Sequence, residues 1–225
     1  MRRIVVINIK GGCGKTTIAT NIASRYAVGG YGVALLDYDP QGSSMNWLQQ
    51  RSRDLPEVHG IAAHHAQHSV TRTFALRTPG HVSRIVVDTP AGLKGYKLSE
   101  QLKDHDVVII PVVPSAIDIH ASADFMRDLL VASKARARHM RLAIIGNRIR
   151  MATPTLHAFE VFLEQLHIPV IARLRDSGNY LLAAEQGLGV HELELPDLPE
   201  AQQDRLAWDA VVDWIESEPH LKLPS

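Results

Sequence analysis

Cysteine is almost absent from this sequence of 225 residues, because Cys13 is the only one. A single thiol cannot form a disulfide bond within the chain, and it cannot supply the several thiolates that an iron–sulfur cluster needs. Such sparing use of cysteine is typical of proteins from a reducing compartment. We therefore expect a cytoplasmic protein without structural disulfides.

The sequence also lacks net charge and long apolar runs. It contains 24 basic and 24 acidic residues, so only a local patch could attract nucleic acid or an anionic membrane. No apolar stretch approaches the roughly 18 residues that a membrane-spanning helix needs. The first apolar run, Ile4 to Ile7, is too short for a signal peptide. These absences predict that the protein is not inserted in a membrane.

Short hydrophobic runs alternate with longer amphipathic stretches along the chain. The short runs are rich in valine and isoleucine and are apolar on both faces, as in a buried parallel sheet. The expected strands are Ile4–Ile9, Val33–Tyr38, Arg84–Asp88, Val107–Val112, Leu142–Ile145 and Val170–Leu174. The expected helices are Lys15–Val28, Ser43–Arg51, Ile117–Ala135, Pro154–Leu166, Tyr180–Gln186 and Ala201–Glu216.

This alternation predicts an α/β fold with a doubly wound, mostly parallel sheet flanked by helices. In such folds ligands bind at the carboxyl ends of the strands. The chain length fits one domain, which we place at residues 1–218, with a short C-terminal tail at residues 219–225. The stretch Leu55–Pro79 has no readable pattern.

A glycine-rich loop, "NIKGGCGKTT" at residues 8 to 17, follows the first expected strand and opens the first helix. Glycines let the backbone approach phosphate oxygens closely, and the helix N-terminus adds partial positive charge. In this setting Lys15 is expected to reach the β- and γ-phosphates, and the Thr16 hydroxyl to bind Mg²⁺. Cys13 fills the variable position of the loop, where a small side chain fits. The loop alone predicts nucleotide binding and leaves the role of Lys10 unexplained.

Several motifs together resemble those of the ParA/MinD family of P-loop ATPases. "KGGCGKTT" resembles the family's deviant Walker A motif, and "LLDYDPQGSSMNWL", at residues 35 to 48, resembles its second motif. "VVDTPAG", at residues 86 to 92, is similar to its Walker B and switch II segments. "VVIIPVVPS", at residues 107 to 115, and "GNRIR", at residues 146 to 150, also lie at positions similar to those of family motifs. The resemblance covers most of the chain, implies a P-loop NTPase fold, and is strongest for small, ParF-like partition ATPases without an N-terminal helix-turn-helix domain.

The resemblance implies roles for individual residues in phosphate and metal binding. Lys15 would bind the phosphates of ATP, and Thr16 would bind Mg²⁺ directly. Asp88 would hold Mg²⁺ through water, and Asp37 would support the metal site. The expected nucleotide contacts are Gly11, Gly12, Cys13, Gly14, Lys15, Thr16, Thr17, Asn147 and Arg148.

The resemblance also implies that assembly and catalysis are linked. Lys10 matches the signature lysine that crosses a dimer interface to the partner's ATP, so ATP would join two subunits face to face. Asp39 matches the aspartate that positions or activates the attacking water. Asn147, with Arg148, matches the residues that recognise adenine. We thus expect an ATPase that dimerises on binding ATP and releases its partner on hydrolysis.

Other members of the superfamily fit the sequence less well. Reductases similar to the nitrogenase iron protein need cysteine ligands that Cys13 cannot supply, and the related tyrosine kinases end in a tyrosine cluster, whereas the last tyrosine here is Tyr180. MinD-like proteins bind anionic lipid through a basic C-terminal helix, but residues 204–218 carry five acids and one arginine. A MinD-like membrane-associated ATPase and a nucleotide-dependent metabolic ligase or synthetase remain as alternatives.

The favoured interpretation is a partition or positioning ATPase that is associated with the nucleoid. Its ATP dimer would bind DNA without sequence specificity, and a ParB- or ParG-like partner protein would stimulate hydrolysis. For the DNA contacts we favour Arg150, Arg173 and Arg175, because the last two follow a strand in a region where the family carries such arginines. A plasmid or chromosomal locus is the preferred cargo, with carboxysomes and chemotaxis clusters as the other possibilities.

Overall fold

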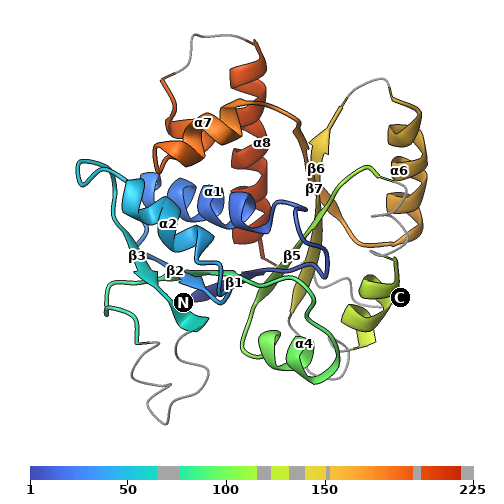
Figure 1. The fold of residues 1–225 in the computed structure, drawn as a ribbon, viewed down its shortest axis with the longest axis horizontal. Coiled ribbons are helices and arrows are strands. Elements are labelled where there is room, and N and C mark those ends of the chain that lie inside the picture. Colours follow the sequence, from blue (N-terminus) through green and yellow to red (C-terminus); the bar gives the residue numbers. More distant parts are fainter. Residues whose placement is uncertain (65–76, 116–122, 132–139, 151–152, 195–198, 219–225) are drawn as a thin grey trace.

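A parallel sheet of seven strands forms the centre of the protein (Figure 1). The computed structural model describes residues 1–64, 77–115, 123–131, 140–150, 153–194 and 199–218. The strands are β1 (Arg2–Val6), β2 (Val33–Asp37), β3 (Val58–Ile61), β4 (Arg84–Asp88), β5 (Val107–Val112), β6 (Arg141–Ile149) and β7 (Val170–Arg175). All neighbouring strands are parallel, in the order β3-β2-β4-β1-β5-β6-β7. Because β1 is central and later strands are added on both sides, the predicted doubly wound α/β fold is confirmed.

Helices cover both faces of this sheet. They are α1 (Lys15–Val28), α2 (Ser43–Gln50), α4 (Gly95–Gln101), α6 (Pro154–Gln165), α7 (Asn179–Glu185), α8 (Pro199–Glu216) and a 3-10 turn, η2 (Val190–Glu192). Residues 123–131 are also helical. Figure 1 shows α1, α2, α7 and α8 on one side of the sheet, and α4 and α6 on the other.

The core consists of two hydrophobic clusters, one on each face of the sheet. Successive residues of a strand point to opposite faces, so Ile4 and Val6 join the cluster under α1 and α8, whereas Val5 joins the cluster under α6. All three side chains are fully buried. Burial on both faces explains why the strands read as continuous apolar runs in the sequence.

The first strand ends earlier than predicted, at Val6 and not at Ile9. Asn8 causes this difference, because its side chain takes over the bonds that a strand backbone would make. Its Nδ2 donates to the Pro111 carbonyl at 2.6 Å, and its Oδ1 accepts from the Lys10 amide at 3.0 Å. The chain therefore leaves the sheet at the point where the glycine-rich loop begins.

Three elements were not expected from the sequence, namely β3, α4 and the 3-10 turn η2, and one expected element is only partly described. The edge strand β3 has four residues and lies in the stretch that showed no pattern, and α4 has seven residues. The expected helix Ile117–Ala135 is helical at residues 123–131, and its other expected residues lie outside the described part. The predicted tail at residues 219–225 also lies outside it.

The C-terminal helix α8 packs on the sheet. Trp208, Val211 and Ile215 are fully buried in the core, whereas Leu206 is exposed. Among the described residues, no helix is both long enough and apolar enough to cross a membrane. The apolar side of α8 is therefore used for packing within the domain.

Candidate functional site

The glycine-rich loop connects the central strand β1 to α1 at the carboxyl edge of the sheet. Gly12 and Gly14 have positive φ angles of 73° and 94°, a region that residues with a side chain rarely adopt. A Cβ on Gly14 would lie 2.1 Å from Nδ2 of Asn147. The loop conformation therefore needs glycine at this position for two independent reasons.

Lys15 is held over this loop. Its ammonium donates a hydrogen bond to the Lys10 carbonyl at 2.9 Å, and the Cys13 thiol donates to the same oxygen at 3.3 Å. Only 7% of Lys15 is exposed. The amide of Lys10 is fixed by Asn8, which the sequence analysis did not single out. The backbone at Lys10 is thus anchored on both sides, and a phosphate group would find Lys15 already positioned at the loop.

A buried carboxylate, Asp88, lies at the end of β4 beside the start of α1. Its Oδ2 accepts a hydrogen bond from the Thr16 hydroxyl at 2.7 Å and another from the Ser44 hydroxyl at 2.7 Å. Its Oδ1 is buried and has no hydrogen-bond partner among the described residues. Burial raises the pKa of Asp88 to about 6, although both hydroxyl bonds oppose the shift.

These oxygen atoms fit a magnesium ion. Carboxylate and hydroxyl oxygens are the protein ligands that Mg²⁺ prefers, and it usually keeps several waters and binds substrate phosphates. The unpaired Oδ1 of Asp88 is a buried acceptor that a hydrated cation would satisfy. No group of three or more His, Cys, Asp or Glu side chains gathers around a common point in the described part of the chain. The site therefore suits a metal that arrives with the nucleotide better than one held by protein ligands alone.

Asp37 is fully buried at the end of β2, directly across from Asp88 in the register of the sheet. Its two carboxylate oxygens accept three backbone N–H groups, those of Asp39, Ser44 and Met45, at 3.0, 3.1 and 3.2 Å. Burial raises the pKa of Asp37. Asp37 thus fixes the N-terminus of α2 and presents Ser44 to Asp88, and its contribution to the metal site stays a prediction.

Asp39 lies in the turn between β2 and α2. Its Oδ1 accepts the Gln41 amide at 2.9 Å, and its carbonyl accepts the Gly42 amide at 2.9 Å. Gly42 has a positive φ of 68°, which completes the tight turn. Asp39 is only half-buried and is held near the carboxylate pair by the backbone that Asp37 anchors. This position is compatible with a role toward a water molecule, and that role stays a prediction.

A cavity of about 470 Å³ lies on the other side of the loop. It is lined by Thr17, Asn147, Arg148, Asp176, Ser177, Gly178, Tyr180, Leu181 and Ala184. Asn147 is buried, and its Nδ2 donates to the Cys13 carbonyl at 2.9 Å, which ties β6 to the loop. The structure thus brings Thr17, Asn147 and Arg148 together, and the cavity they line can accept a planar base.

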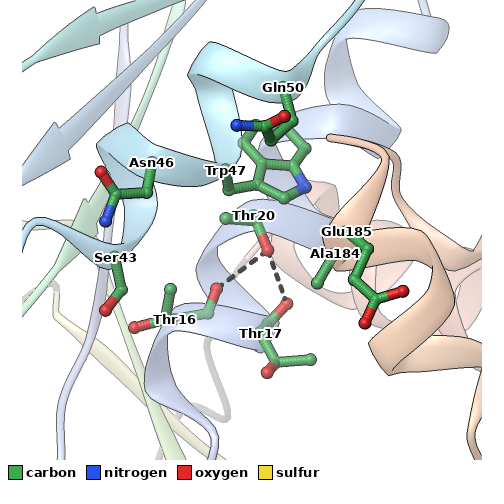
Figure 2. Close-up of a pocket in the computed structure, with 9 residues that line it drawn as sticks. All are labelled: Thr16, Thr17, Thr20, Ser43, Asn46, Trp47, Gln50, Ala184 and Glu185. Atoms are coloured by element: carbon green, nitrogen blue, oxygen red, sulfur yellow. Dashed lines mark hydrogen bonds between the residues drawn. The ribbon is translucent and has the colours of Figure 1, made fainter.

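A second cavity, of about 380 Å³, opens between α1, α2 and α7 (Figure 2). It shares Thr17 and Ala184 with the first cavity. Figure 2 shows the Thr20 hydroxyl turned back to the carbonyls of Thr16 and Thr17, to which it donates at 2.9 and 3.1 Å. These bonds reinforce the first turn of α1, where the phosphate loop ends.

The three arginines that we favoured for DNA contacts are engaged in ion pairs with three different carboxylates. Arg150 pairs with Asp176 at 2.6 Å, and Arg173 pairs with Glu160 at 2.6 Å. Arg175 forms two hydrogen bonds of 2.8 Å to Asp204, which is buried.

The Arg175 pair anchors α8 to β7, so it also has a structural role. A DNA surface that includes these three arginines stays a prediction.

Comparison with known proteins gives matches over most of the chain. A family model described as the CobQ/CobB/MinD/ParA nucleotide binding domain matches residues 4–190. "Maintenance of carboxysome distribution protein A" of Halothiobacillus neapolitanus is 30% identical over 192 residues, which cover 84% of this chain and 87% of that protein. The protein of the same name from Gloeobacter kilaueensis is 29% identical over 217 residues, which cover 95% of each chain.

A solved structure shows the same fold. The ATP complex of McdA from Cyanothece matches with a TM-score of 0.68 over 94% of this chain and 96% of that chain, at 15% sequence identity. At this level of identity the match concerns the fold alone. It supports the predicted P-loop architecture independently of the sequence motifs.

Proposed function

We propose an ATP-driven positioning function, starting from the premise that this chain belongs to the CobQ/CobB/MinD/ParA family of nucleotide-binding domains. In this proposal ATP binding joins two copies of the chain, the dimer binds DNA without sequence specificity, and a partner protein stimulates hydrolysis. Hydrolysis then separates the two copies and releases the DNA. The cycle would place a cargo within the cell.

One observation carries the proposal: the ammonium of Lys15 and the buried carboxylate of Asp88 both lie at the start of α1, where the charge of Lys15 acts on Asp88. Lys15 is held on the loop carbonyl of Lys10, and Asp88 is held by the hydroxyls of Thr16 and Ser44. Phosphoryl transfer needs positioning and charge neutralisation more than covalent participation by the protein. At this helix N-terminus, Lys15 supplies a cation for phosphate oxygens and Asp88 supplies an anion for a metal.

In this proposal each residue of the site has a separate role in hydrolysis. Glycine-loop amides and Lys15 would bind and orient the phosphates, and Thr16 and Asp88 would hold Mg²⁺. When bound, Mg²⁺ neutralises negative charge on the phosphate oxygens. Asp39 would orient a water molecule and accept a proton from it. Lys10 of the second copy would complete the charge around the terminal phosphate, so that a single copy hydrolyses ATP slowly.

The fixed backbone of Lys10 supports its assignment to the dimer interface. Its amide is bound by Asn8, and its carbonyl accepts both Lys15 and Cys13. Because the amide and carbonyl of Lys10 are both hydrogen-bonded, its Cα has a fixed position at the entrance of the loop, and its side chain starts from that position. Such a point suits an ammonium that must reach a partner across an interface.

The names of the relatives help to choose among the possible cargoes. Two relatives that match most of this chain are named for the maintenance of carboxysome distribution. Their names favour a carboxysome over the plasmid or chromosomal locus that we preferred from the sequence. The stimulating partner would then be a protein bound to that cargo, in the place of a ParB- or ParG-like protein bound to a centromere.

ATP binding and hydrolysis by purified protein test the function. Lys15→Ala removes the ammonium at the loop and is expected to weaken ATP binding beyond detection. Lys103→Ala is the matched control, because Lys103 pairs with Glu100 at the end of α4. ATP binding by Lys15→Ala with the affinity of the unchanged protein would contradict the loop assignment. Wild-type specific activity that does not rise with protein concentration would contradict the dimeric active site.

A further inference from the structure

The cavity of about 470 Å³ lined by Asn147 and Arg148 is called the base cavity below. Its wall contains a carboxylate whose role the proposed function leaves open. Asp176 follows β7 and lines the cavity together with Asn147 and Arg148. Its amide donates to the Ile149 carbonyl at 3.0 Å, so its backbone is fixed at the end of β6. The aspartate therefore stays at this wall of the cavity without a ligand.

An arginine on the far side of Asp176 occupies one of its two oxygens. The Nε of Arg150 lies 2.7 Å from Oδ2 of Asp176, and its Nη2 lies 2.6 Å from the same atom. The other oxygen, Oδ1, accepts no hydrogen bond from the part of the chain that the structure describes. Arg150 and Asp176 line a neighbouring cavity, but Arg150 does not line the base cavity. Asp176 thus separates Arg150 from the space that a base would occupy.

We propose that Asp176 selects the base of the nucleotide and that Arg150 restricts this choice to adenine. The proposal rests on the proposed nucleotide-binding function and adds the residues that set its specificity. An ionised carboxylate can only accept hydrogen bonds. Two nitrogens of Arg150 face Oδ2 and fill its acceptor sites, so Oδ1 is the oxygen left for the base, and it can accept the single exocyclic amine of adenine.

Guanine presents a different edge. Its ring N1–H and its exocyclic amine are adjacent donors, and a carboxylate with two free oxygens accepts both at once, as it does from arginine. Arg150 prevents this two-point contact because it uses one of the oxygens. The positive charge of Arg150 also offsets the negative charge that Asp176 presents to the base. Loss of Arg150 would therefore favour guanine, whereas loss of Asp176 would remove the contact for both bases.

Leu181 gives independent support for a ligand at this place. It lines the same cavity, and 66% of its surface is exposed although it is a large apolar residue. Tyr180 forms another part of the wall, and its hydroxyl accepts a hydrogen bond from the buried Trp208 at 3.3 Å. A planar base would cover Leu181 and contact a tyrosine that is already held in place.

The test is the ratio of ATP to GTP affinity, measured by calorimetry with the full chain and Mg²⁺. Arg150→Ala should tighten GTP binding roughly tenfold and leave ATP binding nearly unchanged, as expected for one added hydrogen bond to a charged group. Asp176→Ala should weaken ATP binding by about tenfold. In the double variant, the gain for GTP should disappear. Arg127→Ala is the matched control, because it breaks an exposed pair with Asp124 away from the cavity.

The outcomes separate this proposal from the function on which it rests. If the unchanged protein binds neither ATP nor GTP, the proposed function fails, and base selection fails with it. If the protein binds ATP but the ratio is the same in Arg150→Ala and in Arg127→Ala, base selection alone is overturned. A gain for GTP that persists in the double variant would also overturn it, because Asp176 would then not be the acceptor. Far-ultraviolet circular dichroism of each variant shows that the measured protein is folded.

Discussion

Asp88→Asn is expected to stabilise the metal-free protein at neutral pH, although it removes a residue predicted to hold Mg²⁺. Asp88 is fully buried, and its Oδ1 has no partner among the described residues. An asparagine side chain is neutral and keeps an oxygen that can accept from Thr16 and Ser44. The variant thus removes the cost of burying a charge and retains both hydrogen bonds.

The size of the effect follows from the pKa of Asp88. Burial raises this pKa from 3.8 to about 6, and each pKa unit corresponds to about 1.4 kcal/mol, so the cost of ionising Asp88 in the fold is ~3 kcal/mol. Below pH 3.8 both the folded and the unfolded protein hold a neutral carboxyl, and the cost is absent. It grows as the pH rises and is complete above about 6. The advantage of Asp88→Asn should therefore be greatest at pH 7 to 8 and should vanish toward pH 4.

Urea denaturation in the presence of EDTA, followed by tryptophan fluorescence at several pH values, measures this advantage. The difference in unfolding free energy between Asp88→Asn and the unchanged protein is the quantity to compare. Addition of Mg²⁺ and ATP should stabilise the unchanged protein and have much less effect on the variant, since a ligand stabilises the state that binds it. A difference that does not change with pH would refute the assignment of the buried charge to Asp88.

Asp37→Asn is the matched contrast at the neighbouring position of the sheet. Both oxygens of Asp37 accept backbone N–H groups, so an amide would place its NH₂ group against a donor. The mismatched amide should cost about 1–3 kcal/mol, which opposes the gain from removing a buried charge, so this variant should lack the stabilisation expected for Asp88→Asn. Stabilisation of both variants to the same extent would show that the hydrogen bonds at these two aspartates do not differ in the way described.

Three further changes are expected to separate assembly, structure and DNA binding. Lys10→Ala should bind ATP normally in equilibrium dialysis but hydrolyse it at least tenfold more slowly, and full activity would remove Lys10 from the shared site. Arg51→Ala should cost about 3–5 kcal/mol in urea denaturation, because it leaves the buried Glu192 carboxylate without a countercharge, with only the Ser24 hydroxyl and the Gly189 amide as partners; a loss under 1 kcal/mol would contradict this. Arg173→Gln should lower DNA retention in a filter assay without changing dimerisation, and unchanged retention would exclude Arg173 from the DNA surface.

The parts of the fold that the sequence predicted are those with a strong local signal. The central strands are continuous runs of Val and Ile, and the loop carries its glycines in a fixed spacing before Lys15. The edge strand β3 and the short helix α4 have four and seven residues. Such short elements are stabilised by their neighbours more than by their own sequence, so no periodic pattern marks them.

The site was predictable only where a motif contains the residue. Thr16 and Asp88 each stand in a motif, but their hydrogen bond spans 72 residues of the chain, and no spacing reveals it. Ser44 and Asn8 were missed because serine and asparagine are common beside turns. Their partners, Asp88 and Pro111, become neighbours only when the parallel strands align.

The arginines show the same limit. Sequence position predicted that Arg150, Arg173 and Arg175 are surface cations, yet each one is paired with a carboxylate from another element. Asp204 lies 29 residues from Arg175, and its burial depends on the packing of α8. Charge counts along a sequence therefore do not show which cations are available to a partner.

The most direct test of the central claim is the molecular mass of Asp39→Ala in solution with different nucleotides. This variant is expected to bind ATP and to fail in hydrolysis, so it should remain in the ATP-bound state. One chain has a mass of 24.9 kDa. Light scattering with Mg²⁺ and ATP should give twice that mass, and with ADP it should give the mass of one chain. A single-chain mass in saturating ATP would contradict an active site that two copies complete together.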